Sequence, residues 1–151
     1  MSNFTKSFAL KNEAQTQALG GRLAPILQVG DVLALRGDLG AGKTSLSRGV
    51  IGALTGALEV PSPTYTLVQT YDGTDFSIWH FDLYRLESET HVWELGIEDA
   101  LDTGVCLIEW PERIEGLLSG DELNIHIEFE GEGRKLTLSG HEKWRERLAA
   151  L

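Results

Sequence analysis

The sequence predicts an α/β fold of three layers, in which a central mixed, partly parallel sheet is flanked by helices. Asp31–Arg36 is a short apolar strand, and a glycine-rich turn and an amphipathic helix follow it. Gly104–Ile108 is a continuous apolar run, as expected of a strand buried on both faces of a parallel sheet. From Leu123 to Leu138 apolar and polar residues alternate around a turn at Gly131, the pattern of an antiparallel hairpin.

The N-terminal third of the chain predicts one further strand and two helices. Phe4–Leu10 is expected to be a strand. Asn12 is expected to cap a helix that ends before Gly30, with Gln15 reaching back to the cap. Thr44–Leu54 is expected to be the second helix, because its apolar residues recur at helical spacing.

The rest of the chain predicts short elements. Two prolines in Pro61–Thr64 predict a rigid loop without helix. The other elements are expected to be paired strands at Leu67–Tyr71 and Phe76–Asp82, short helices at Glu87–Leu95 and Pro111–Leu118, the hairpin, and an amphipathic helix around Trp144–Leu151. Gly96 is expected to end the first of these short helices. No repeat or linker divides the chain, so residues 1–151 are expected to form a single domain.

Composition favours a globular protein of the cytoplasm. Hydrophobic residues make up 42% of the chain and charged residues 24%. Apolar runs are all shorter than the ~20 residues that span a bilayer. Met1–Lys6 does not have the charged and apolar regions of a signal peptide. Cys106, the lone cysteine, excludes an internal disulfide and is expected to be a small buried side chain.

The chain is acidic, with 13 basic and 23 acidic residues and a net charge of −10. Nucleic-acid backbones are bound by clusters of Lys and Arg. The one dense basic cluster is near the C-terminus, and acidic residues dilute it (Lys143, Arg145 and Arg147, with Glu142 and Glu146). We therefore expect any contact with nucleic acid to be made mainly through a partner.

A phosphate-binding loop is the strongest motif. Gly37–Thr44 matches G-x-x-x-x-G-K-[ST] at every fixed position. The glycines let backbone N–H groups surround phosphate oxygens, and the helix that follows adds its own unpaired N–H groups. Lys43 is expected to neutralise phosphate charge and Thr44 to ligate Mg²⁺. The motif thus predicts a P-loop NTPase-like fold and nucleotide contacts from Asp38, Leu39, Gly40, Ala41, Gly42, Lys43, Thr44 and Ser45.

A magnesium site also needs a carboxylate at the end of a neighbouring buried strand. Glu109 directly follows the apolar run and Asp82 ends an earlier strand, so both are candidate catalytic residues with Lys43, and Glu109 is a candidate metal ligand. Trp110 is a candidate wall of the nucleotide site and Thr64 a candidate contact near the γ-phosphate. His80 remains open between a water-orienting, phosphate-binding or purely structural role. ATP is favoured over GTP because the chain has no Asn-Lys-x-Asp element.

Four segments resemble one known family. They are Gly37–Thr44, Ser62–Tyr65, His80–Arg85 and Ile108–Pro111, and Glu94–Ile97 extends the likeness. Over most of residues 8–115 they resemble the bacterial TsaE family, formerly YjeE.

The resemblance implies a weak, partner-dependent ATPase with ATP and Mg²⁺ as cofactors, needed for threonylcarbamoyladenosine in tRNA. It implies TsaD and TsaB as partners, with tRNA contacted indirectly and no membrane. Carried over by position, Lys43 and Thr44 hold phosphate and magnesium, Glu109 and Asp82 are the acids, Ser62–Thr64 is a switch-like loop, and Trp110 lies beside the nucleotide. Without the resemblance, a small-molecule kinase and a non-hydrolysing ATP-sensing module rank equally with the ATPase.

Overall fold

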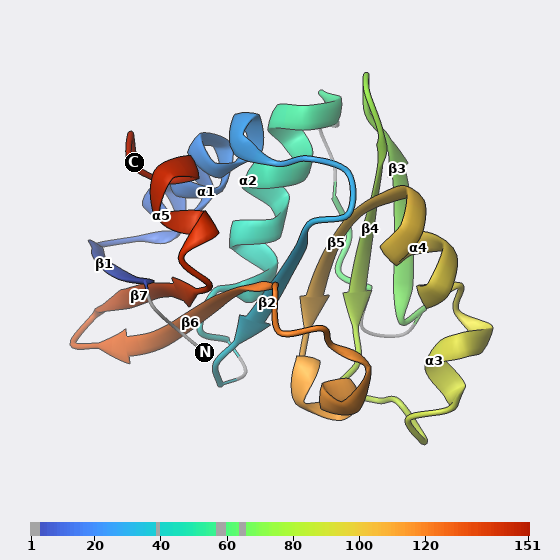
Figure 1. The fold of residues 1–151 in the computed structure, drawn as a ribbon. Coiled ribbons are helices and arrows are strands. Elements are labelled where there is room, and N and C mark those ends of the chain that lie inside the picture. The colour runs from blue at the N-terminus through green and yellow to red at the C-terminus, as the bar shows by residue number, and fades with distance from the viewer. Residues whose placement is uncertain (1–3, 39, 57–59, 64–65) are drawn as a thin grey trace.

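The computed structural model describes residues 4–38, 40–56, 60–63 and 66–151. Within them, strands form one seven-stranded sheet in the order β1-β7-β6-β2-β5-β4-β3 (Figure 1). The strands are β1 Phe4–Leu10, β2 Val32–Arg36, β3 Val68–Asp72, β4 Ser77–Asp82, β5 Gly104–Glu109, β6 Leu123–Glu130 and β7 Gly133–Gly140. The helices are α1 Glu13–Leu23, α2 Lys43–Thr55, α3 His91–Glu94, α4 Ile97–Thr103 and α5 Lys143–Arg147, with 3₁₀ turns η1 Ala24–Ile26 and η2 Pro111–Leu117.

The centre of the sheet is parallel and its two sides are antiparallel. Strand β2 pairs in parallel with both β5 and β6, and β4 pairs in parallel with β5. Strands β1, β7 and β6 form one antiparallel side, and β3 pairs antiparallel with β4 on the other. The predicted mixed, partly parallel sheet is therefore confirmed. Because parallel strands end at the same edge, the last residues of β2, β4 and β5 lie together there.

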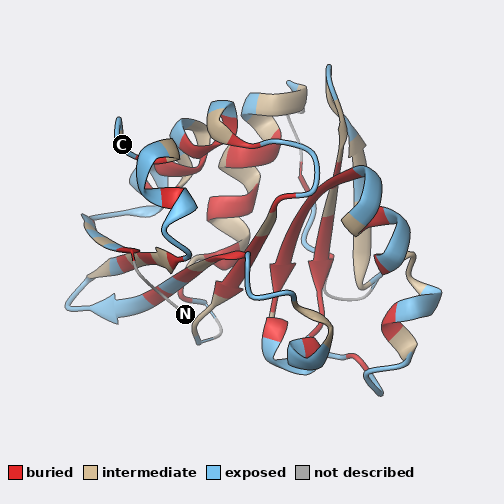
Figure 2. Ribbon diagram, viewed as in Figure 1, coloured by how far each residue is buried: buried red, intermediate tan, exposed pale blue. Residues whose placement is uncertain are grey.

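Helices cover both faces of this sheet. On β5, Val105 and Leu107 belong to a core cluster with α1 and α2, whereas Cys106 and Ile108 belong to a second cluster with α3 and α4. This alternation follows from the two-residue period of a strand. Figure 2 shows the central strands buried between these layers. The three-layer prediction and the burial of Cys106 are both confirmed.

Helix α1 begins where the sequence predicts. The Asn12 side chain accepts a hydrogen bond from the Gln15 backbone N–H at 2.9 Å, and the Gln15 side chain accepts one from the Lys11 N–H at 2.7 Å. Helix α1 then packs closely against α2 at a contact that contains glycine. A Cβ at Gly20 would lie 2.4 Å from the Leu46 carbonyl oxygen, so the small residue permits this close approach.

The segment between β4 and β5 differs from the prediction. A single helix over residues 87–95 is wrong, because α3 spans only His91–Glu94 and a second helix, α4, occupies Ile97–Thr103. Gly96 lies between them with φ of 86°; it follows the C-cap of α3, as predicted for a helix stop, and α4 begins directly after it. No helix in the described ranges is both long enough and apolar enough to cross a membrane.

Candidate nucleotide site

The loop between β2 and α2 adopts backbone angles that require glycine. Gly37, Gly40 and Gly42 have φ of 140°, 79° and 123°. A Cβ at Gly37 would lie only 2.2 Å from the Ile127 carbonyl oxygen. Helix α2 starts at Lys43, and no side chain caps its first turn, so its leading N–H groups are available to an anion. Leu39, a predicted contact, lies outside the described residues.

Lys43 is buried at the mouth of this loop. Its Nζ donates to the Gly37 carbonyl oxygen and lies 3.4 Å from that of Asp38 and 3.8 Å from the centre of the Trp110 ring. Burial lowers the pKa of Lys43 from 10.5, and nearby carboxylates oppose that shift, those of Glu109, Glu112, Asp82 and Asp38. The side chain thus presents a cation in a partly dehydrated position, where its attraction for a phosphate is stronger than in bulk water.

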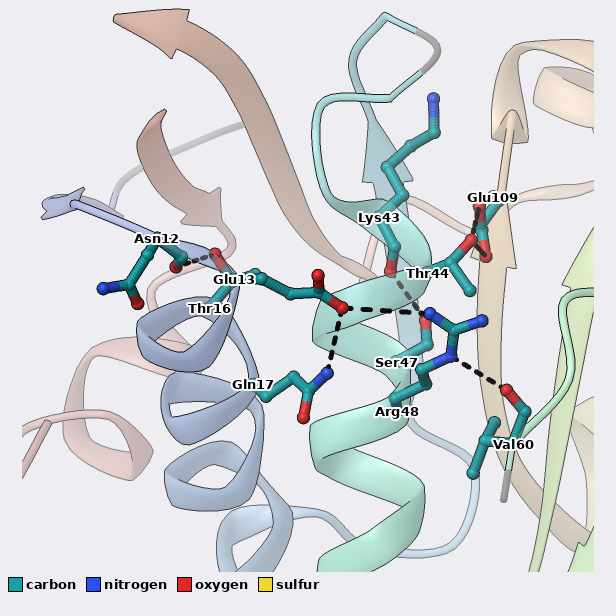
Figure 3. A network of polar contacts seen from close by, with 10 residues as sticks. All are labelled: Asn12, Glu13, Thr16, Gln17, Lys43, Thr44, Ser47, Arg48, Val60 and Glu109. Atoms are coloured by element: carbon teal, nitrogen blue, oxygen red, sulfur yellow. Dashed lines mark hydrogen bonds and ion pairs between the residues drawn. The ribbon is translucent and has the colours of Figure 1, made fainter. Parts of the chain in front are cut away.

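Thr44 and Glu109 meet across the gap between α2 and β5. Thr44 Oγ1 donates to the carboxylate of Glu109, 3.1 Å from Oε1 and 3.0 Å from Oε2 (Figure 3). His80 Nε2 lies 2.6 Å from Oε2 of the same carboxylate. The β4–β5 register places Asp82 opposite Glu109, and both acids are buried. The fold therefore brings together, at one edge of the sheet, candidate residues that the sequence predicts in three separate segments.

Trp110 closes the outer side of the site. It is a non-glycine residue with φ of 62°, a conformation that costs about 1–3 kcal/mol and is held by its surroundings. Its backbone N–H donates to the Leu35 carbonyl oxygen at 3.3 Å, and its ring lies 4.9 Å from that of Tyr84. A cavity of about 180 Å³ is lined by Gly40, Gly42, Lys43, Thr44, Ser45, Asp82, Glu109 and Trp110.

A second cavity, of about 310 Å³, adjoins the first through Gly40, Gly42 and Ser45. Its other walls come from the start of α1, the loop and the β6–β7 hairpin, namely Lys11, Asn12, Glu13, Thr16, Ala41, Glu132, Gly133 and Arg134. Arg134 Nε donates to the Ala41 carbonyl oxygen at 3.0 Å, which ties the hairpin to the loop. Sequence reasoning missed this wall, since nothing local to residues 11–16 or 132–134 marks them as neighbours of the loop.

The other predicted contacts divide into two groups. Asp38 is exposed and meets the site only through its backbone carbonyl and its charge. Thr64 lies outside the described residues, so its predicted role stays a prediction. Among the described residues no group of three or more His, Cys, Asp and Glu side chains is arranged to hold a metal ion by itself. The donors at hand are a hydroxyl and two carboxylates, the oxygen ligands that Mg²⁺ takes when phosphate and water complete its shell.

The parallel sheet, the glycine loop and the helix that starts at its lysine define a protein of the P-loop NTPase-like class. The family described as "Threonylcarbamoyl adenosine biosynthesis protein TsaE" matches residues 10–136. The chain therefore belongs to the TsaE family, which acts in the biosynthesis of threonylcarbamoyladenosine in tRNA.

Individual relatives agree with this assignment. The chain is 42% identical over 128 residues to the tRNA threonylcarbamoyladenosine biosynthesis protein TsaE of Rickettsia felis, covering 84% of this chain and 75% of that protein. With the Bacillus subtilis TsaE protein it shares 37% identity over 125 residues, or 82% and 78% of the two chains. The crystal structure of Bacillus subtilis YdiB superposes with a TM-score of 0.81 at 31% identity, covering 99% of this chain and 94% of that one.

Proposed function

We propose that this chain binds Mg-ATP and hydrolyses it to ADP and phosphate, as a partner-dependent ATPase of tRNA threonylcarbamoyladenosine biosynthesis. The observation that carries the proposal is the meeting of Lys43, Thr44 and Glu109 at the mouth of a glycine loop. In this proposal residues 1–151 act as one ATPase domain in the cytoplasm. TsaD and TsaB are its partners, and they hold the tRNA.

The two adjoining cavities suit the two ends of a nucleotide. The loop amides, the start of α2 and Lys43 would bind the phosphates and neutralise the charge that develops on the γ-phosphate. Ser45 lies between the cavities and is available to the α-phosphate side. The larger cavity by Asn12 and Arg134 would take the nucleoside, and Trp110 would exclude water from the phosphate end.

Thr44, Glu109 and Asp82 would hold the metal. Because Thr44 donates its hydroxyl proton to Glu109, the lone pairs of its oxygen remain for a cation. Magnesium, when bound, would neutralise charge on the β- and γ-phosphates. Asp82 and Glu109 line the phosphate-side cavity and are the candidates to orient the attacking water. His80 is fully buried and bonded to Glu109, so it is not placed to touch water or phosphate.

Binding and hydrolysis of ATP test this proposal, each measured with and without TsaD and TsaB. Lys43→Ala should lower turnover about 100-fold or more, as expected for loss of a positioned charge donor. Its circular dichroism should be unchanged. Lys135→Ala is the matched control, because it removes the same charge from an exposed position on β7.

Three results would contradict the proposal. Normal hydrolysis by Lys43→Ala would refute the assigned site. Phosphoryl transfer to an added metabolite would favour a small-molecule kinase. Mg-ATP binding without turnover, even beside the partners, would favour a non-hydrolysing module.

A further inference from the structure

His80 is a buried histidine that contacts Glu109, the candidate metal ligand. His80 has no exposed surface, and its Nε2 lies 2.6 Å from Glu109 Oε2. It comes from β4, whereas Glu109 ends β5, and the parallel register pairs His80 with Leu107 and Asp82 with Glu109. His80, Asp82 and Glu109 therefore point to the same face of the sheet, the face that α2 covers.

Among the described residues, the imidazole of His80 has one hydrogen-bond partner, Glu109. Nδ1 is buried and has no hydrogen-bond partner in the part of the chain that the structure describes. An ionised carboxylate only accepts hydrogen bonds, so with Glu109 ionised the 2.6 Å contact is a hydrogen bond that His80 donates from Nε2 to Oε2. A buried nitrogen without a partner costs free energy. An apolar side chain of similar volume would pack without this cost, so the hydrogen bond to Glu109 is what the histidine adds at this position.

The carboxylate of Glu109 is consequently held from two sides. His80 donates to Oε2 from the sheet interior, and Thr44 donates to both oxygens from the first turn of α2. Two donors from different elements fix the plane of the carboxylate. That fixed plane in turn keeps the Thr44 hydroxyl donating toward Glu109, with its lone pairs left for a metal ion.

We propose that His80 is a positioning residue that sets the orientation of Glu109, and through it Thr44, for the magnesium–nucleotide complex. It acts without touching nucleotide or metal. This inference rests on the proposed function, since it assigns His80 a part in the same site. Partners that orient a metal ligand typically affect metal affinity about 10–100-fold when removed.

Two substitutions at His80 separate the effect of its hydrogen-bond donor from the effect of its side-chain volume. His80→Gln keeps an N–H donor near the place of Nε2, whereas His80→Leu fills similar space without a donor. Ile78→Ala is the matched control, because Ile78 is fully buried on the same strand and sits two residues away on the same face. The probe is the non-hydrolysable analogue β,γ-imido-ATP, titrated calorimetrically with and without Mg²⁺.

His80→Leu should lose about 10–100-fold of the affinity that Mg²⁺ adds in the wild type, with metal-free affinity changed less than about twofold. His80→Gln should keep most of that gain, and Ile78→Ala should keep all of it. Independently, nitrogen NMR of the metal-free, nucleotide-free protein should show a hydrogen on His80 Nε2.

The outcomes distinguish this inference from the proposed function. If Mg²⁺ adds no affinity in the wild type, the proposed function fails and the inference falls with it. If the wild type shows the gain and His80→Leu retains it, His80 positions nothing and only the inference is overturned. Equal losses in His80→Leu and Ile78→Ala would assign His80 to stability alone.

Discussion

Glu109 is both the last residue of a buried strand and a hydrogen-bonded member of the candidate site. It ends a strand whose apolar side chains belong to the two core clusters, and its carboxylate receives hydrogen bonds from Thr44 and His80. The sequence marks it because a magnesium site needs a carboxylate at the end of a buried strand, and Glu109 directly follows an apolar run. Local patterns nominate both Thr44 and Glu109, but the bond between them joins residues 65 positions apart. The contact between these two side chains could not be predicted, because it depends on how β2 and β5 pair in the sheet.

Cys106, on the face of β5 opposite to Glu109, gives a prediction on pH. Burial raises the pKa of its thiol from 9.0 to about 12. A folded pKa above the unfolded value means that its contribution to stability is present below about pH 9 and is lost between about pH 9 and pH 12. Relative to Cys106→Ala, the wild-type free energy of unfolding should fall by up to about 1.4 kcal/mol per pH unit in that window.

Urea unfolding of both proteins at pH 8 and at pH 10.5 measures this difference. At pH 8 the thiol should also resist thiol reagents until the protein unfolds. A stability difference that stays constant up to pH 10.5, or rapid labelling of the folded protein, would contradict the buried, protonated thiol.

Helices α1 and α2 give a prediction on packing, because two adjacent glycines of α1 differ in what surrounds them. A Cβ at Gly20 meets backbone, 2.4 Å from the Leu46 oxygen and 3.0 Å from the Val50 nitrogen, whereas a Cβ at Gly21 lies 4.0 Å from the nearest atom, the Gly49 oxygen. Gly20→Ala should destabilise by about 1–3 kcal/mol through overpacking. Gly21→Ala should stabilise by about 0.5–1 kcal/mol, since alanine favours helix.

Thermal or denaturant unfolding of the two variants tests this contrast, and each protein serves as the control for the other. Shifts of the same sign would mean that α1 and α2 do not pack as closely as described. Because α2 carries Lys43 and Thr44 in its first turn, the same packing sets where the candidate phosphate site lies relative to the sheet.

Elements whose signal is local could be predicted, and those that depend on distant contacts could not. The strand, glycine turn and helix around Gly37–Thr44 follow from their own residues. Gly96 ends α3 as predicted, but the sequence pattern does not show that a second helix, α4, begins directly after it. With its φ of 86°, Gly96 ends α3 and also begins the turn into α4, and a Cβ there would lie 3.1 Å from the Trp79 ring. Arg134 could not be predicted as a neighbour of the loop, because its hydrogen bond to Ala41 joins residues 93 positions apart.

The whole molecule carries a net charge of −10, which bears on whether it binds tRNA directly. Like charges repel, and binding to a nucleic-acid backbone follows the number of phosphates that basic residues neutralise. In the C-terminal basic cluster, Arg147 is already paired with Asp31 at 2.5 Å and Arg145 with Glu142 at 2.5 Å. The surface therefore offers little attraction to tRNA.

Gel retardation tests this directly. The isolated chain should leave the mobility of tRNA unchanged at physiological salt, whereas TsaD and TsaB should retard it. Tight tRNA binding by this chain alone, weakening steeply as salt rises, would contradict the expectation that partners hold the tRNA.

The central claim is that the ATP site of this chain drives tRNA modification. Threonylcarbamoyladenosine should be measured over many turnovers in a mixture of tRNA, threonine, bicarbonate, ATP, TsaD, TsaB and the other pathway proteins. One reaction contains the wild-type chain, one omits it, and one contains Lys43→Ala. Sustained turnover only with the wild type is the predicted result, and equal product in all three reactions would contradict the claim.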